Sequence, residues 1–433
     1  MSQASISTTP LTAERSPWLR GPVRLPGDPF FSAMALILAA MARGESVLEN
    51  LSTAPSTAAV AAVLGELGAR IDERAGRWHV QGIGVGSFLA PRQALDMAAT
   101  GDAAPLLVAL LGAHDFTTEF KVLAHTPDVL ALLDFLKRNG ALVEDEGTVT
   151  RLRAPRFGIP LDMALSEAGK GLVAPLLLHA LVTVGRSHLQ LPTGLHDAVI
   201  DFLAAFGARI NTREDDDILH VELEGLAPLR AQALTAAGDP HLAVYPAAAA
   251  AIAPDSEITI SGVALHARGL ALLDALALMG SDISIGETER GSADIVVRHA
   301  PLVGTTIPTD LGVSPDDFPI LAVAAAFAEG ETLLEGLGEG VRRLALTRAL
   351  RANGVECVEQ PGGLIVRGRP RVPGGGNVVV RLDPKLAMAF LVLGMAADRA
   401  VTIENGAAMA EMFPDFVSAF EHVGASFSAG LAA

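Results

Sequence analysis

The chain has 433 residues, half of them hydrophobic, and a formal net charge of −17. Its length exceeds what one hydrophobic core fills, so we expect two or three domains. The acidic excess, with only four lysines among 32 basic residues, argues against nucleic acid or an anionic membrane as a partner. No apolar run reaches the roughly 18 residues of a membrane-spanning helix.

The N-terminal segment, residues 1–20, is polar and lacks the charged region and apolar stretch of a signal peptide. We therefore expect a cytoplasmic protein. A single cysteine, Cys357, permits no internal disulfide and agrees with a reducing compartment. The eleven histidines show no metal-ligand spacing, so the sequence predicts no metal site, and we expect no cofactor.

An internal repeat organises the chain. An amphipathic helix ends in Gly, a small or β-branched residue follows, and an alternating strand begins. A residue just past a helix end commonly has positive φ, which only Gly adopts without cost. Successive glycines lie 72, 67, 73, 74 and 70 residues apart. The six repeat glycines are Gly68, Gly140, Gly207, Gly280, Gly354 and Gly424.

Each repeat combines a helix with a hairpin. Val129, Leu132, Leu133 and Leu136 show helical spacing ahead of Gly140. Short polar turns then separate two strands in each repeat. The acidic run 214–217 is such a turn, and we interpret it as solvated and not as a metal loop.

Alternating helices and strands in units of about 70 residues indicate an α/β fold whose units share their cores, because one unit is too small to bury its own. Six units grouped as three plus three give two similar domains. A cleft between two domains is the default ligand site.

Several segments carry a family resemblance. Together with the repeat, they resemble the EPSP synthase family of enolpyruvyl transferases, particularly its glyphosate-tolerant bacterial class. The segments are residues 21–28, 318–330, 382–388 and 413–416.

The resemblance implies two inside-out α/β barrel-like domains, each of three βαβαββ repeats. One comprises residues 1–24 and 235–433 and the other residues 25–234, with crossovers near Arg24 and Leu234. The family's interdomain cleft closes on two small molecules, shikimate 3-phosphate and phosphoenolpyruvate, and the resemblance suggests a monomer.

Family enzymes transfer the enolpyruvyl group of phosphoenolpyruvate to a hydroxyl and release phosphate through a tetrahedral intermediate. Holding several negative charges close together demands Lys and Arg. Moving protons on and off the hydroxyl and the methylene carbon demands a carboxylate or an amine.

In the C-terminal half, Asp316 matches the family's catalytic aspartate. Counting back from residues 353–354 places Glu339 on its glutamate and Arg342 on its arginine. Asp383 is kept, and Lys385 replaces an arginine, which preserves the charge but not the bidentate fork. The resemblance thus makes Asp316 and Glu339 catalytic, and Arg342, Asp383 and Lys385 substrate-binding.

In the N-terminal half, most basic positions of the family are lost. Pro29, Phe30 and Met34 replace lysine, serine and arginine, so Phe30 and Met34 are predicted to line an apolar part of the cleft. Asp28 with Pro29 still makes a good N-cap and first turn. Lys170, between two glycines, and His196, on a cleft-lining segment of the family, are further candidates for substrate binding.

A charge-assisted hydrogen bond contributes roughly 1.5–3 kcal/mol. Four or five such losses outweigh the binding energy of a micromolar ligand, about 8 kcal/mol. We therefore predict a divergent enzyme that acts on a less phosphorylated, partly apolar substrate. The alternative is a non-catalytic binding or regulatory homologue.

The surviving residues also have purely structural interpretations. Asp316 or Asp317 can cap the helix that follows them. Arg342 and Arg343 can form a solvated helix face. The segment 169–171 can be a flexible loop, and His196 a satisfied polar residue.

Overall fold

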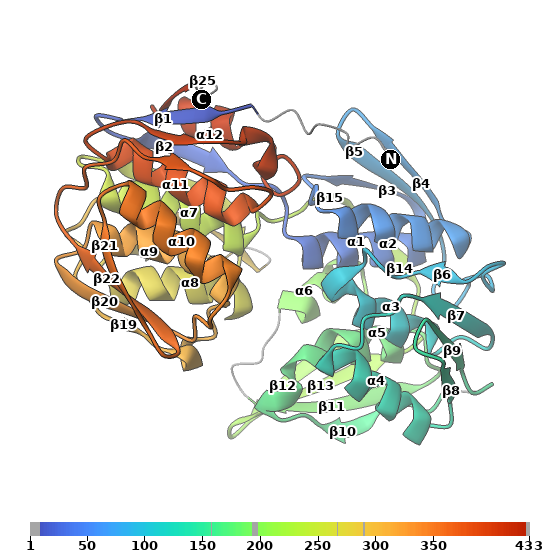
Figure 1. Ribbon diagram of the computed structural model, residues 1–433. Helices are drawn as coiled ribbons and strands as arrows, with labels where there is room; N and C mark the ends of the chain where they lie inside the picture. Colours follow the sequence, from blue (N-terminus) through green and yellow to red (C-terminus); the bar gives the residue numbers. More distant parts are fainter. Residues whose placement is uncertain (1–8, 157, 193–197, 266, 289–290, 430–433) are drawn as a thin grey trace, which may run out of the picture. The chain divides into compact units, whose positions relative to one another are not determined.

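The computed structural model describes residues 9–156, 158–192, 198–265, 267–288 and 291–429. The chain forms two compact units (Figure 1). Unit 1 comprises residues 1–26 and 238–433, and unit 2 comprises residues 27–237. The chain changes unit after Pro26 and after Ala237, where the sequence analysis places crossovers near Arg24 and Leu234.

Unit 2 begins with a helix and ends with short edge strands. Its helices are α1 (Pro29–Met41), α2 (Pro55–Glu66), α3 (Ala104–Leu111), α4 (Pro127–Arg138), α5 (Val173–Leu181) and α6 (Ala198–Ala205), with 3₁₀ turns η1 (Gly101–Ala103) and η2 (Glu167–Leu172). Its strands are β3 (Ala42–Glu49), β4 (Arg70–Arg74), β5 (Arg77–Ile83), β6 (Leu95–Asp96), β7 (Thr117–Lys121), β8 (Leu142–Asp145), β9 (Val149–Arg153), β10 (Asp162–Ala164), β11 (Arg186–Pro192), β12 (Ile210–Asp215), β13 (Ile218–Glu224), β14 (Leu229–Arg230) and β15 (Ala233–Thr235).

Unit 1 draws on both ends of the chain. Its helices are α7 (Pro240–Ile252), α8 (Ala267–Leu278), α9 (Phe318–Ala326), α10 (Val341–Ala352), α11 (Pro384–Ala396) and α12 (Phe416–His422), with 3₁₀ turns η3 (Thr309–Leu311), η4 (Pro315–Asp317) and η5 (Gly406–Met409). Its strands are β1 (Leu11–Glu14), β2 (Arg20–Arg24), β16 (Glu257–Ala264), β17 (Asp282–Ile285), β18 (Ser292–Arg298), β19 (Thr306–Ile307), β20 (Gly330–Glu335), β21 (Glu356–Gln360), β22 (Gly363–Gly368), β23 (Asn377–Val378), β24 (Val401–Ile403) and β25 (Ser426–Ala429). None of the helices in the described ranges is long and apolar enough to span a membrane.

Six sheets form in the described part of the chain and share one strand order, to which the sheet of β3 adds a fifth strand, β15. A short edge strand pairs in parallel with the strand that enters the repeat, and the two hairpin strands follow antiparallel, as in β10-β11-β13-β12. The same pattern gives β6-β7-β9-β8 in unit 2 and β19-β20-β22-β21 in unit 1. The repeat predicted from the sequence is therefore also a repeat of topology.

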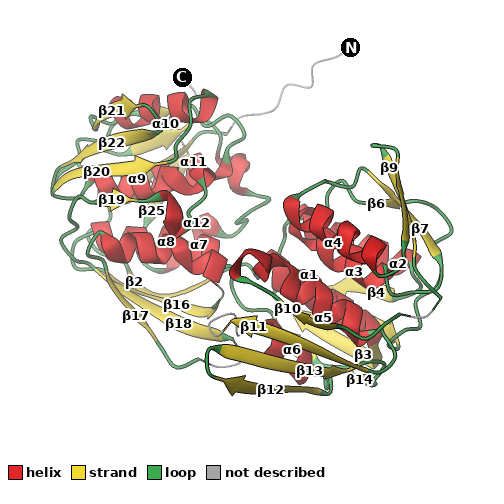
Figure 2. Ribbon diagram, turned by 90° about the horizontal axis from the view of Figure 1, so that it is seen from below, coloured by secondary structure: helices red, strands yellow, loops and turns green. Residues whose placement is uncertain are grey.

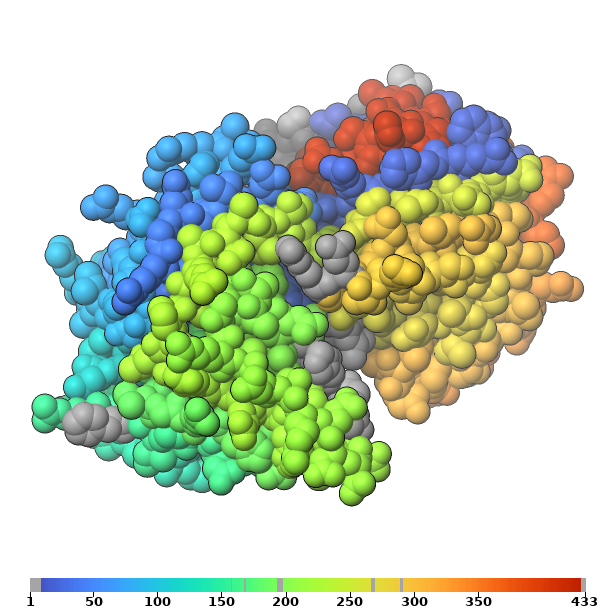
Figure 3. All heavy atoms as spheres, turned by 180° about the vertical axis from the view of Figure 1, so that it is seen from behind, coloured from blue at the N-terminus to red at the C-terminus, as the bar shows by residue number. Residues whose placement is uncertain are grey.

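The sixth sheet, formed by β23, β24, β1 and β25, includes the N-terminal strand β1. Strand β1 lies between β24 and β25, with Leu11 opposite Ile403 on one side and Ala429 on the other. Blue N-terminal residues accordingly border the red C-terminal segment on the surface of unit 1 (Figure 3). Because β1 is an inner strand of this sheet, unit 1 is built from both the N-terminal and the C-terminal segments of the chain.

Each unit buries helices behind its sheets (Figure 2). All described residues of α3, α5 and α9 are buried, and so are nearly all residues of α1, α7 and α11. The outer helices are amphipathic; α4 buries Val129, Leu132, Leu133 and Leu136, as the spacing predicts. This arrangement confirms the predicted inside-out α/β class.

Three of the inner helices begin with Asp-Pro. Asp28, Asp239 and Asp383 are the N-caps of α1, α7 and α11, and each side chain accepts a hydrogen bond from a backbone N–H of the first turn. Pro at the first helical position has no N–H to leave unsatisfied. The sequence therefore fixes where these buried helices start.

The six repeat glycines all have positive φ, between 76° and 106°, as predicted. The acidic turn between β12 and β13 is exposed, which confirms the solvated interpretation, and this green to yellow-green part of the chain lies on the surface in Figure 3.

Some hairpin strands approach the buried helices too closely for any side chain. A Cβ on Gly368 of β22 would overlap the carbonyl oxygens of Ala325 and Ala328, at the end of α9. A Cβ on Gly82 of β5 would likewise overlap the carbonyl oxygens of Ala39 and Ala42, at the end of α1. Backbone contact replaces side-chain packing at these positions.

Candidate active site

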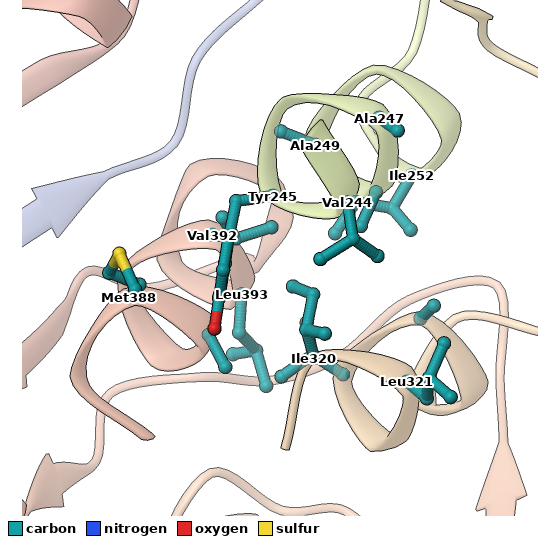
Figure 4. Close-up of a cluster of buried hydrophobic side chains, with 14 of the residues drawn as sticks. Val244, Tyr245, Ala247, Ala249, Ile252, Ile320, Leu321, Met388, Val392 and Leu393 are labelled. Carbon is teal, nitrogen blue, oxygen red and sulfur yellow. The ribbon is translucent and has the colours of Figure 1, made fainter. Parts of the chain in front are cut away.

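Four of the predicted residues of the C-terminal half, together with Asp317, gather at the starts of α9, α10 and α11 in unit 1. We name Asp316, Asp317, Arg342, Asp383 and Lys385 the ion-pair cluster. Helices α9 and α11 pack side by side in the core, with α7 against both (Figure 4), and the ion pairs of Arg342 bring the start of α10 to them.

Arg342, near the start of α10, binds two carboxylates of the cluster. Its guanidinium forms an ion pair with Asp316, and its Nε lies 3.9 Å from Oδ2 of Asp383. The three side chains are 61%, 45% and 30% exposed, respectively. This part of the cluster is therefore open to solvent and to a ligand.

Lys385 forms the second ion pair of the cluster, with Asp317. The Asp317 side chain is only 6% exposed and that of Lys385 24%. Burying a carboxylate costs free energy unless a partner compensates it, and the ammonium is that partner. Lys385 is therefore committed to an internal contact.

The helix-capping interpretation applies to neither Asp316 nor Asp317. Asp317 is the N-cap residue of α9, but its side chain makes no capping hydrogen bond. Ser314 instead accepts a hydrogen bond from the backbone N–H of Asp316, at 3.3 Å. Both carboxylates are thus available for the cluster.

Asp383 combines a structural and a site role. Its Oδ1 accepts hydrogen bonds from the backbone N–H groups of Lys385 and Leu386, at 3.0 and 3.1 Å, which caps α11. Its Oδ2 faces Arg342. Folding of the helix start therefore orients this carboxylate.

Tyr245 interacts electrostatically with carboxylates of the cluster, and no sequence pattern predicted it. It extends from α7 between Met388 and Leu393 of α11 (Figure 4). Burial first, and then the charges of Asp317, Asp383 and Asp239, raise the pKa of its phenol well above the ordinary value. The hydroxyl therefore stays protonated beside these carboxylates.

The charges of the cluster nearly cancel. Three carboxylates face two cations, and the starts of α9 and α11 add the partial positive charge of helix N-termini, which favours the carboxylates. Both cations of the cluster are thus already paired with carboxylates of the chain.

Exposed apolar side chains adjoin the cluster along the chain. Val341 and Leu344 flank Arg342 and its neighbour on α10 and are 71% and 44% exposed. Leu382, which precedes Asp383, is 65% exposed. The site therefore combines paired charges with accessible apolar surface.

Glu339 lies outside the cluster. Its side chain is 83% exposed, and its carboxylate lies 3.5 Å from Nη2 of Arg343. Within the described ranges no ion pair or hydrogen bond joins it to Asp316. Its predicted catalytic role stays a prediction.

Arg343 is not on a solvated face, which corrects one structural interpretation. Its side chain is 9% exposed, and its guanidinium donates to the carbonyl of Gln360 at 3.1 Å and pairs with Glu359 at 3.3 Å. This arginine ties the start of α10 to the hairpin of β21 and β22.

The candidates of the N-terminal half belong to unit 2. Lys170 is exposed, and the segment 169–171 belongs to the 3₁₀ turn η2. A Cβ on Gly171 would overlap the carboxylate of Asp128, so an acidic group already lies beside this turn. His196 lies outside the described residues.

Phe30 and Met34 have different environments on α1. Phe30 is half-buried, and its ring meets that of Phe31 edge to face at 5.5 Å. Met34 is completely buried. Of the predicted apolar lining, only Phe30 is accessible, because Met34 points into the core.

Within the described residues, no group of three or more His, Cys, Asp or Glu side chains is arranged to hold a metal ion.

Comparison with known proteins places this geometry in a family context. The sequence model of EPSP synthase (3-phosphoshikimate 1-carboxyvinyltransferase) matches residues 14–420. The chain is 33% identical over 440 residues to a 3-phosphoshikimate 1-carboxyvinyltransferase of a Chelativorans species, covering 97% of this chain and 98% of the relative. It is 36% identical over 452 residues to that of Rhodospirillum rubrum, covering 98% and 99%.

Solved structures agree on the fold. EPSP synthase from Acinetobacter baumannii superposes with a TM-score of 0.81 at 23% identity, covering 98% of this chain and 100% of that one. The enolpyruvyl transferase NikO from Streptomyces tendae gives a TM-score of 0.67 at 21% identity, with the same coverage. These comparisons confirm the predicted family and fold class.

Proposed function

The chain belongs to the EPSP synthase family of carboxyvinyl-transferring enzymes, and from that premise we propose that it is a divergent transferase whose acceptor carries less phosphate than shikimate 3-phosphate and includes an apolar part. The observation that carries this proposal is the pairing of both cations of the cluster, Arg342 and Lys385, with carboxylates of the chain itself.

A phosphorylated ligand would have to compete with these internal carboxylates. Each charge-assisted hydrogen bond to a ligand contributes about 1.5–3 kcal/mol only if the cation is free to make it. Displacing Asp317 from Lys385 would also leave a buried carboxylate without a partner, which costs several kcal/mol. An acceptor with a hydroxyl and few charges avoids both costs.

The residues have distinct roles in this proposal. Asp316 exchanges protons with the acceptor hydroxyl and the methylene carbon. Arg342, the more exposed cation, holds a single carboxylate of a substrate, and Asp383 orients Arg342. Val341, Leu344 and Leu382 offer surface to an apolar group.

Phosphate release tests the proposal. The purified protein is incubated with phosphoenolpyruvate and either shikimate 3-phosphate or a panel of unphosphorylated hydroxyl compounds, beginning with shikimate. We expect no turnover with shikimate 3-phosphate, and phosphate release with an unphosphorylated acceptor that is abolished in Asp316→Ala.

Two controls make the result decisive. An authentic EPSP synthase under the same conditions shows that the assay detects turnover, and Asp310→Ala removes an aspartate of the preceding 3₁₀ turn, which is outside the cluster. Turnover of shikimate 3-phosphate that depends on Asp316 would refute the proposal, since other basic residues would then supply the phosphate site.

A non-catalytic homologue is the second candidate. The exposed position of Glu339 favours it, because only one of the two predicted proton-transferring carboxylates belongs to the cluster. This candidate predicts that ligands raise the melting temperature without any phosphate release. Cytoplasmic location and a monomeric state stay predictions of the sequence.

A further inference from the structure

We infer that Asp316 and Asp317 determine specificity by acting as internal counterions, which weaken the binding of multiply charged anionic ligands at Lys385 and Arg342. The inference rests on the proposed function and deepens it, because it names the residues that set the charge of the accepted substrate.

Among the described residues, the ion-pair partner of the Asp317 carboxylate is Lys385. Asp317 occupies the N-cap position of α9, but its side chain makes no capping hydrogen bond. Its carboxylate pairs instead with Lys385, in the first turn of α11. The pair occupies the ammonium in an environment where charge interactions are strong, because both side chains are largely removed from water.

Asp316 pairs with Arg342 at the surface, as Asp317 pairs with Lys385 in the interior. A guanidinium with one bound carboxylate and a second one at 3.9 Å is electrically satisfied. The two adjacent aspartates thus neutralise the two cations of the cluster separately, one buried and one exposed.

Replacing either aspartate by a neutral residue would leave its cation without that ion-pair partner, close to helix N-termini. Asn has nearly the shape of Asp but no charge, so Asp317→Asn leaves Lys385 as an unpaired ammonium at the starts of α9 and α11. An unpaired ammonium and a helix N-terminus both attract anions. Asp316→Asn leaves Arg342 with Asp383, at 3.9 Å, as its remaining ion-pair partner among the described residues.

The experiment measures the affinity for phosphoenolpyruvate by calorimetry at low ionic strength, where charge effects are not screened. For Asp317→Asn and Asp316→Asn we expect binding about 10- to 100-fold tighter than wild type, the equivalent of one new charge-assisted hydrogen bond. Added salt should reduce the gain.

Asp398→Asn is the matched control. It makes the same change in net charge in unit 1 and also releases an arginine, Arg371, from a pair at 2.9 Å. Asp398 follows the C-terminal end of α11, the opposite end from Lys385. We expect its affinity for phosphoenolpyruvate to equal that of wild type.

The inference is overturned if the folded variants bind phosphoenolpyruvate no more tightly than Asp398→Asn. Asp317→Asn risks misfolding because its site is buried, and Asp316→Asn, at an exposed site, then decides alone. Turnover of shikimate 3-phosphate by the wild type would refute the proposed function but not this inference, which is measured as a difference between variants.

Discussion

Replacing His114 should make the stability of unit 2 less sensitive to acid. His114 follows α3 and is 5% exposed. Its Nδ1 lies 2.8 Å from the carbonyl oxygen of Leu110, so Nδ1 carries the proton, and its Nε2 is buried without a partner. Phe88 and Phe116 lie against the ring, so a proton on Nε2 would find no acceptor.

Burial lowers the pKa of His114, despite the opposing bond to Leu110, and it also lowers the pKa of the buried His179. The unfolded chain, with a pKa of about 6.5, thus binds more protons than the folded one below that pH. Stability is full above about pH 6.5 and falls with decreasing pH, by about 1.4 kcal/mol per pH unit for each histidine, until the folded-state pKa is reached.

The two tryptophans provide a specific assay. Trp18 belongs to unit 1 and Trp78 to unit 2, so in a Trp18→Phe background the fluorescence reports on unit 2 alone. Urea unfolding is followed from pH 7 to pH 5 for His114→Asn, which can keep the hydrogen bond to Leu110. The exposed His422 of unit 1 provides a control variant, His422→Gln.

The result to compare is the slope of the free energy of unfolding against pH, since His114→Asn also lowers stability at every pH by leaving space. We expect a slope smaller by about 1.4 kcal/mol per pH unit than in the control. An unchanged slope would refute the reasoning that protonation of buried His114 drives acid unfolding.

Three further predictions concern the backbone and the helix caps. Val122 has a positive φ of 53°. Val122→Gly should therefore raise the free energy of unfolding by about 1 kcal/mol, because the relief of backbone strain exceeds the entropy cost of Gly. A lower free energy of unfolding in urea for this variant than for the wild type would contradict the prediction. Asp383→Ala should lower stability by about 1 kcal/mol through loss of the cap, whereas Asp383→Asn, which keeps an acceptor, should lower it less; equal melting temperatures would refute the capping role. Gly368→Ala should cost about 2 kcal/mol or more, and Gly338→Ala, at an open position, almost nothing; equal urea midpoints would show that the backbone can move aside.

The repeat was predictable from the sequence because its signals are local. A helix period followed by Gly and a turn depends on neighbouring residues, and the positive φ values of the six glycines confirm it. The role of β1 was not visible in this way, because a four-residue strand carries little pattern and its partners, β24 and β25, lie in the C-terminal part of the chain.

The cluster was predictable only in part. Asp316, Arg342, Asp383 and Lys385 were found through resemblance to the family, and the structure brings them together. Asp317 was missed as a site residue because its burial and its pairing depend on the packing of α9 against α11. An aspartate directly before a wholly apolar helix was the available signal.

Two other side chains show the same limit. Arg343 was interpreted as solvated because it follows Arg342 in a charged stretch, yet a one-residue step on a helix turns the side chain by about 100° and buries it. Met34 was expected at a ligand surface because it replaces an arginine of the family, but α1 is buried almost throughout.

The position of β1 in the sixth sheet has a consequence for biosynthesis. Residues 27–237 are complete when little more than half of the chain has left the ribosome, and domains generally fold as units during synthesis. Strand β1, made first, must wait for β24 and β25, made last. Unit 2 can thus fold early during synthesis, whereas unit 1 completes its fold only after the C-terminal strands have been made.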